Sequence, residues 1–191
     1  HLALGLVLRR QRRPAEAEAA FRDAVRLKPE SAQARAELGG ALFEQAKYAA
    51  AAEAFGEAIR LRPDFAKAHV SLGLALARQG DYARAEAAFR EALGWKPGDA
   101  VARANLGTVL RRQRKAAEAE ALHREAVRRD PSLAPAQLDL AAALYEQGKH
   151  AEAAAAYREA VRLRPADAKA HLGLGLALER QGRLGDALAA Y

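Results

Sequence analysis

Histidine and arginine are the side chains of this 191-residue chain that could bind ligands, because the sequence contains no cysteine. A chain without cysteine has neither a disulfide framework nor a thiolate metal site. His1, His69 and His171 are candidate metal ligands, but they stand 68 and 102 residues apart and no H-E-x-x-H pair accompanies them. We therefore expect these histidines to pack in a core or at its boundary, and we expect no metal site.

Two arginine clusters could bind a polyanion. They read RRQRRP at 9–14 and RRQRK at 111–115, in a chain whose formal net charge is +7. Such clusters attract nucleic acid through phosphate contacts. The clusters lack the interleaved aromatic side chains on which bases stack, so nucleic acid is an unlikely partner.

No set of residues in the sequence combines an acid, a base and a nucleophile, so we expect a protein that is not an enzyme. The run LGLGL at 172–176 resembles a glycine-rich phosphate loop, but it falls inside a predicted helix and leaves no loop to hold a phosphate. We therefore expect no cofactor. No apolar run reaches the roughly 20 residues that span a bilayer.

The elements that would position these side chains repeat along the chain every 34 residues. Prolines recur with this period, as do leucine, glycine, alanine and a large ring. The prolines stand at 29, 63, 97, 131 and 165. The glycines are Gly5, Gly39, Gly73, Gly107 and Gly175, with Ala141 in the one gap, and the rings are Phe21, Phe55, Phe89, Tyr157 and Tyr191, with His123 as the exception.

Each repeat is predicted to be two helices. The first spans 66–79 in one repeat, with Leu72 and Leu76 on one face, and the second spans about 82–95. Asp81 can cap the second helix, and Pro97 ends it. Glycine inside a helix costs about 1 kcal/mol relative to alanine, so the repeated glycine indicates a close helix contact. Alanine and arginine are strong helix formers, and an all-α chain follows.

The pattern L-G-x-x-L, then A-x-x-x-F/Y-x-x-A, then P, resembles the tetratricopeptide repeat over the whole chain. The resemblance implies a single right-handed α-solenoid, a superhelix of stacked antiparallel helix pairs. Its concave groove would be lined by the first helix of each pair. The family's usual tryptophan near the start of that helix is absent. The repeats are 1–31 (partial), 32–65, 66–99, 100–133, 134–167 and 168–191 (partial).

The groove is predicted from the stripe beside the core face of each first helix. It is mostly apolar, which suits an amphipathic helix or an extended peptide, although these residues could equally tighten contacts between successive helices. The candidate groove residues are Leu2, Leu6, Arg9, Ala36, Gly40, Phe43, Val70, Leu74, Ala77, Ala104, Asn105, Thr108, Arg111, Leu138, Ala142, Tyr145, Leu172, Leu176 and Glu179.

Two binding modes of similar repeats do not fit these positions. Repeats that clamp the carboxylate tail of heat-shock chaperones need lysine and asparagine on this face, where leucine, alanine, valine, glycine or threonine stand here. Repeats like those of O-linked N-acetylglucosamine transferase carry an asparagine ladder, for which only Asn105 qualifies. The ladder positions hold Ala3, Glu37, Ser71, Asn105, Asp139 and Gly173.

The arginine clusters also have a structural interpretation. Both lie at the end of a predicted first helix, where the helix dipole favours cations by roughly 0.3–1 kcal/mol. Arg9 and Arg10, and likewise Arg111 and Arg112, should lie near the groove. The clusters are 102 residues apart, which is three repeats, and other segments match at the same distance, so a three-repeat block is inferred to be duplicated.

Three further residues invite a functional reading that we do not favour. His123 replaces a core ring, so we expect it to pack there with a hydrogen-bond partner or a water. His150 opens a second helix and is expected to be solvated. Trp95 stands where other repeats have Leu27, Leu61 and Leu163, which favours a core or interface position.

The sequence thus predicts a protein–protein interaction scaffold that binds a peptide or helix. The alternative is the regulatory or docking arm of a larger enzyme, such as a kinase or glycosyltransferase, and a polyanion binder is a third reading. We also expect self-association through uncapped ends, and a cytoplasmic location. The excess of arginine over lysine is typical of high-GC coding sequences, which favours a bacterial source.

Overall fold

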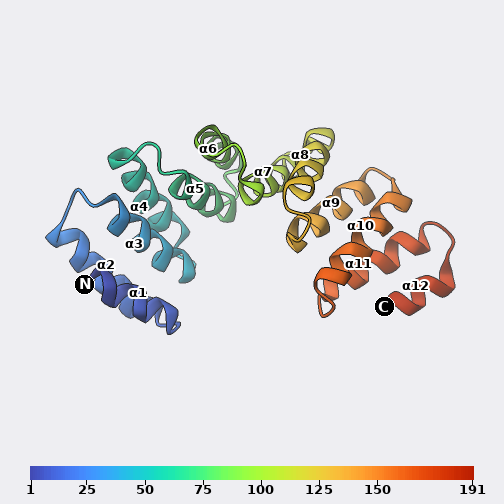
Figure 1. Cartoon of the computed structure of the whole chain (residues 1–191), viewed down its shortest axis with the longest axis horizontal. Helices are drawn as coiled ribbons and strands as arrows, with labels where there is room; N and C mark the ends of the chain where they lie inside the picture. The colour runs from blue at the N-terminus through green and yellow to red at the C-terminus, as the bar shows by residue number, and fades with distance from the viewer. The chain divides into compact units, whose positions relative to one another are not determined.

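The computed structural model describes all residues, 1–191, and consists of helices joined by short turns (Figure 1). No strand is present, which confirms the predicted all-α class. The helices are α1 (Leu2–Arg10), α2 (Pro14–Leu27), α3 (Ala32–Glu44), α4 (Tyr48–Leu61), α5 (Ala66–Arg78), α6 (Tyr82–Trp95), α7 (Ala100–Arg112), α8 (Ala116–Arg129), α9 (Ala134–Glu146), α10 (His150–Leu163), α11 (Ala168–Glu179) and α12 (Leu184–Ala190).

The helix ends follow the expected local chemistry. Helices predicted at 66–79 and 82–95 are α5 and α6, and Asp81 caps α6 by accepting a hydrogen bond from the Arg84 backbone N–H at 3.1 Å. Pro14 stands at the start of α2, where its missing N–H has no partner to lose. We call the odd-numbered helices the A helices and the even-numbered ones the B helices.

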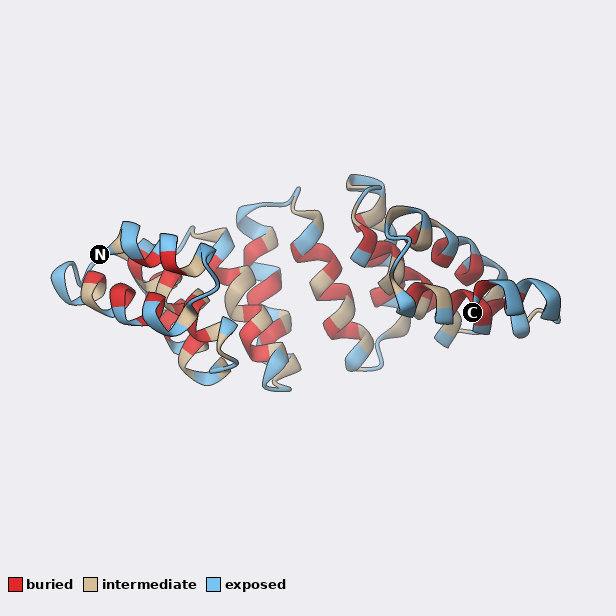
Figure 2. Cartoon of the chain, turned by 90° about the horizontal axis from the view of Figure 1, so that it is seen from below, coloured by how far each residue is buried: buried red, intermediate tan, exposed pale blue.

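Contacts between helices divide the chain into two compact units, residues 1–97 and 98–191. Within each unit an A helix packs on the B helix that follows it, and that B helix packs on the next A helix. Neighbouring A helices also touch, α1 with α3 and α3 with α5 in the first unit, and α7 with α9 and α9 with α11 in the second. Figure 2 shows the buried side of each helix turned toward its partners. A single solenoid over 1–191 stays a prediction.

The repeated glycine gives the ring of its own repeat a place to lie. A Cβ added at Gly39 would stand 2.7 Å from the Phe55 ring, and one at Gly73 would stand 2.8 Å from the Phe89 ring. Distances below about 3.0 Å are not tolerated, so any side chain at these positions would displace the ring. Glycine is therefore required where the A and B helices approach each other most closely.

In the fifth repeat, 134–167, the aromatic ring lies against a glycine of the next repeat. Ala141 stands at the glycine position of α9, and the Tyr157 ring of α10 lies against Gly173 of α11. A Cβ at Gly173 would stand 2.3 Å from that ring. The ring of this repeat thus packs at the junction with the next repeat rather than against a glycine of its own helix pair. Position 173, one of the asparagine-ladder positions, is therefore glycine for a structural reason: a side chain there would clash with Tyr157.

The turn between the A and B helices uses a left-handed residue in every repeat. Glycine holds it at Gly80, Gly148 and Gly182, with φ between 75° and 82°, whereas Arg12, Ala46 and Arg114 adopt φ between 58° and 63°. Non-glycine residues pay roughly 1–2 kcal/mol for this conformation. The arginine that follows the glutamine in each cluster, Arg12 or Arg114, therefore occupies a position that favours glycine.

A glutamine at the end of the A helices ties successive repeats together. The Gln45 side chain donates to the Pro14 carbonyl at 3.2 Å, and Gln181 donates to the His150 carbonyl at 3.0 Å. Gln79 and Gln147 make the same bond to Tyr48 and Ala116. In each case the acceptor is the first residue of the preceding B helix. The sequence signal was available, because glutamine recurs every 34 residues here.

Candidate functional site

The first arginine of each cluster binds acidic side chains of the next A helix. Arg9 pairs with Glu37 and, at 3.1 Å, with Glu44 of α3, while Arg111 pairs with Glu146 of α9 at 2.6 Å. The Arg9 and Arg111 side chains are only 29% and 18% exposed. These charges are therefore committed to ion pairs between neighbouring A helices, a structural role that the helix-dipole interpretation did not identify.

Two buried glutamates bind the lysine that directly precedes the next B helix. Lys149 donates to Glu120 at 2.7 Å, and this hydrogen bond, opposed by burial and aided by Arg124, lowers the pKa of the Glu120 carboxyl. Glu18 has the same arrangement: burial alone would raise its pKa, but Lys47 and Gln45 donate to it and the net effect lowers the pKa. The two sites are 102 residues apart, in line with the inferred duplication.

The histidines at the family's tryptophan position anchor the loop that precedes their helix. His69 Nε2 lies 2.8 Å from the Pro63 carbonyl oxygen, and His171 Nε2 lies 2.9 Å from that of Pro165. His69 is buried, His171 is half-buried and His1 is exposed. No group of three or more His, Cys, Asp or Glu side chains converges on a point where a metal ion could bind.

His123 is fully buried against Gly107, in the place of the core ring. Neither ring nitrogen has a hydrogen-bond partner, so the expected partner is not found among the protein's groups. Burial lowers the pKa of His123 to about 4, with Asp139 opposing the shift and Arg111 adding to it. The imidazole is therefore neutral near pH 7.

Two other expectations about single residues are wrong. Trp95 is 53% exposed, and at the corresponding position Leu27 is exposed too, whereas Leu163 is half-buried. His150 is half-buried rather than solvated. Its ring lies 5.2 Å from the Tyr145 ring, and this contact with the end of α9 removes it from water.

The A helices of the first unit enclose a hollow around Gly40, between α3 and α5. One lobe has a volume of about 160 Å³ and the other about 120 Å³, and the lobes share Gly40, Phe55 and Ser71. We call this the Gly40 hollow. Its remaining lining residues are Arg9, Gln33, Ala36, Glu37, Phe43, Glu44, Phe65, Lys67, Ala68 and Leu74.

Phe43 forms a fixed aromatic wall of the Gly40 hollow. Its ring packs edge-on against Tyr48, with centroids 5.3 Å apart, and the Arg78 guanidinium lies 5.6 Å from its centroid. The floor is the Phe55 ring, which lies directly against Gly39, while the neighbouring Gly40 adds no side chain to the hollow. The floor is apolar and the wall is held in place before any ligand binds.

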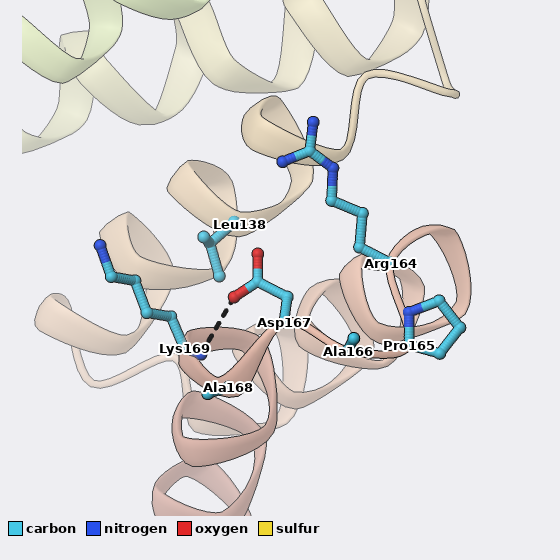
Figure 3. A pocket seen from close by; sticks show the side chains of 7 residues that line it. All are labelled: Leu138, Arg164, Pro165, Ala166, Asp167, Ala168 and Lys169. Carbon is cyan, nitrogen blue, oxygen red and sulfur yellow. Dashed lines mark hydrogen bonds between the residues drawn. The ribbon is translucent and has the colours of Figure 1, made fainter.

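The A helices of the second unit carry a wider, more open hollow of about 810 Å³ (Figure 3). Leu138 of α9 forms one side, and the loop and first turn of α11 form the other. Asp167 caps α11 by accepting from the Lys169 and Ala170 backbone N–H groups at 3.0 and 3.3 Å. The long side chains of Arg164 and Lys169 extend on either side of this cap (Figure 3).

The predicted groove residues divide into those that remain available on the A helices and those that do not. Leu6, Leu172 and Leu176 are exposed, and Arg9, Ala36, Gly40, Phe43 and Leu74 meet around the Gly40 hollow. Val70, Ala77, Leu138, Ala142 and Tyr145 are half-buried, and Glu179, which is exposed, accepts from the Tyr191 hydroxyl.

Four predicted groove positions are engaged by the fold. Ala104 is buried against Ala126 and Ala136, and Leu2 packs against the core of the first unit. Thr108 donates to Asp139 of α9 at 2.8 Å, and Asn105 donates to the Val101 carbonyl of its own helix at 2.9 Å. Sequence reasoning missed Phe55 as a lining residue. The adjacent pair Gly39 and Gly40 was the signal that could have found it.

Within each unit, the arrangement of helix pairs that pack on the next pair is that of a helical-repeat solenoid. The sequence profile described as "Tetratricopeptide repeat" matches residues 2–55, 41–100 and 72–134, and a second, described as "TPR repeat", matches residues 141–182. The chain belongs to the tetratricopeptide repeat family. No curated protein sequence matches it, and no helix has the length and apolar character needed to cross a bilayer.

Solved structures share the fold at low sequence identity. The chain is similar to PilW, described as a widely conserved type IV pilus biogenesis factor, with a TM-score of 0.90 and 22% identity over 99% of this chain and 88% of that one. For pilF of Pseudomonas aeruginosa the TM-score is 0.87, with 21% identity over 99% and 86%. YrrB, a TPR protein with an unusual peptide-binding site, gives 0.71 and 21% over 90% and 88%. The predicted all-α solenoid fold is confirmed.

Proposed function

We propose that this chain is a non-catalytic protein–protein interaction scaffold, which binds a peptide or an amphipathic helix of a partner along its A helices. The observation that carries the proposal is the Gly40 hollow, a recess on the A helices of the first unit whose smaller lobe has the aromatic wall Phe43 and the apolar side chains of Phe55 and Leu74. Recesses of this kind accept the apolar anchors of a bound segment. YrrB, a structural neighbour, has a peptide-binding site.

The charges on this face support a polypeptide partner over a polyanion. Arg9 and Arg111 are paired with glutamates of the neighbouring A helices, so they do not present free positive charge to phosphate groups. A peptide that buries apolar side chains needs no such charge. A polyanion would depend on it, and its binding would weaken steeply with salt.

A displayed library of random peptides tests the proposal. Peptides selected on the intact chain should bind it with little dependence on salt between 50 and 200 mM. Phe43→Ala and Tyr145→Ala should weaken this binding while circular dichroism reports unchanged helicity, because both rings are half-buried on the A helices. Unchanged affinity in both variants, or failure to select any binder, contradicts binding at this face.

Self-association is a further part of the proposal. The outer helices expose apolar side chains, with Leu4 and Val7 53% and 49% exposed on α1, and Leu184 and Leu188 62% and 77% exposed on α12. Apolar patches of this kind favour contact with another protein surface. Light scattering over a range of concentrations should show mass above the monomer, and replacement of Leu188 by Lys should reduce it; a monomer at every concentration contradicts this part.

A further inference from the structure

The Gly40 hollow has a size and lining that select its occupant. Its smaller lobe, about 120 Å³, approaches the roughly 150 Å³ of apolar cavities that bind benzene, and it is the lobe that Phe43 lines. Phe55 also lines this lobe and is only 4% exposed, so it offers apolar ring atoms and no hydrogen-bonding group. A single benzene-sized ring therefore suits the smaller lobe, where it could pack edge-on against Phe43.

The charged side chains near the smaller lobe are already engaged, and the remaining cation, Lys67, lines only the larger lobe. Arg9 binds both Glu37 and Glu44, and Gln33 donates to the second oxygen of Glu37 at 2.6 Å. A charged guest would have to break these bonds or enter without a counter-charge of its own, which costs more than placing an apolar group there. The rim thus favours an uncharged, apolar occupant.

We infer that the Gly40 hollow is the anchor subsite of the binding face, and that it takes one phenylalanine-like ring from a partner polypeptide. This inference rests on the proposed function and assigns the anchor to one place and one side-chain chemistry. Gly40 sets the site, because position 40 is the only A-helix position in this register without a side chain: the others are Leu6, Leu74, Thr108, Ala142 and Leu176.

Gly40→Leu fills the hollow without breaking the fold. A Cβ at Gly40 would meet only Arg9, 3.1 Å from Nη1, which is the end of a flexible side chain. Leucine already stands at this position in three other repeats, and it is a better helix former than glycine. Gly56→Leu on α4 is the matched control, because a Cβ there has no neighbour within 4 Å and lies outside the hollow.

The first experiment uses two small probes and amide NMR. N-acetyl-phenylalaninamide should shift the Gly40 and Ser71 amide signals, and N-acetyl-argininamide should leave them in place. Gly56→Leu should keep the phenylalanine-dependent shifts at Ser71 and Gly40→Leu should abolish them at Ser71, with a melting temperature at or above that of the parent. Absence of shifts with the phenylalanine probe, equal shifts with both probes, or shifts that survive in a folded Gly40→Leu variant would overturn the inference.

The second experiment separates the anchor from the proposed function. Peptides selected on the parent chain should contain an aromatic residue whose replacement by alanine weakens binding by roughly tenfold or more, the usual loss for a buried anchor. The same peptides should bind Gly40→Leu comparably weakly and Gly56→Leu normally. Peptides that bind the parent and Gly40→Leu equally well would overturn the anchor subsite while leaving the scaffold function standing; a library that yields no binder overturns both.

Discussion

Replacing His123 with phenylalanine should stabilise the second unit and remove much of its sensitivity to mild acid. At this position the other repeats carry Phe21, Phe55 and Phe89 or a tyrosine, so the slot beside Gly107 is built for a ring of this shape. The imidazole brings two buried nitrogens without partners, and an unsatisfied buried group costs about 1–3 kcal/mol. Even at pH 7 the variant should therefore be more stable by about 1–3 kcal/mol.

The stability difference between His123→Phe and the parent should grow as the pH falls. The pKa of His123 is depressed from 6.5 to about 4 in the folded chain, so below pH 6.5 the unfolded chain binds a proton that the folded chain does not. The free energy of unfolding of the parent is therefore not reduced by this group above pH 6.5, and it decreases as the pH falls from 6.5 toward 4. At about 1.4 kcal/mol per pH unit, the depression corresponds to about 3 kcal/mol over that range.

Urea unfolding followed by the amide NMR signals of α7 and α8 measures this effect locally, since repeat proteins need not unfold in one step. The pH dependence between 7 and 4 should be shallower in His123→Phe by about 3 kcal/mol. Phe21→His is the reciprocal control, because it places an imidazole against Gly5 in the first unit and should create the same acid sensitivity there. A His123 pKa near 6.5 by NMR, or equal pH slopes in parent and variant, would refute the reasoning.

Three smaller perturbations test the packing rules. Gly148→Ala should destabilise by about 1 kcal/mol, because φ is 75° and a Cβ there meets nothing, whereas Ala46→Gly should be neutral or stabilising in the same denaturation assay. Gly173→Ala should be the costlier glycine change and should be partly rescued by Tyr157→Ala, which a double-mutant cycle measures. Glu120→Gln should lose about 2 kcal/mol at pH 7, and its difference from the parent should shrink as the pH drops below 4.5, since the lowered pKa makes the stabilisation disappear on protonation.

The fold could be predicted because the residues that determine helix ends and helix contacts recur in each repeat. The helix bounds of α5 and α6, the Asp81 cap and the glycine under the ring all follow from short-range chemistry that the 34-residue period displays several times over. Repetition also explains the ion pairs at the clusters in outline: cations were expected at helix ends, although their acidic partners on the next A helix, such as Glu146, were not identified.

What the sequence did not reveal are properties of single positions that depart from the repeat. His123 was given a hydrogen-bond partner because buried polar groups usually have one, and only the packed neighbours show that none reaches it. Trp95 was assigned to the core or an interface because leucine stands at its position in three other repeats, although its side chain is 53% exposed. Phe55 lines the Gly40 hollow, and its ring has room there because Gly39 has no side chain, which a pattern of apolar residues does not register.

The displaced ring slot of Tyr157 makes the repeats unequal as modules. In repeats whose ring lies against a glycine of the same repeat, such as Phe89 against Gly73, the helix pair contains both partners of this contact. Such a pair could be transplanted or duplicated intact. In the repeat at 134–167, the Tyr157 ring instead lies against Gly173, which belongs to the following repeat. Cutting the chain between residues 167 and 168 would separate Tyr157 from the glycine that its ring contacts. Exchange of repeats at that boundary should therefore give unfolded chains, whereas exchange between residues 65 and 66 should give folded ones.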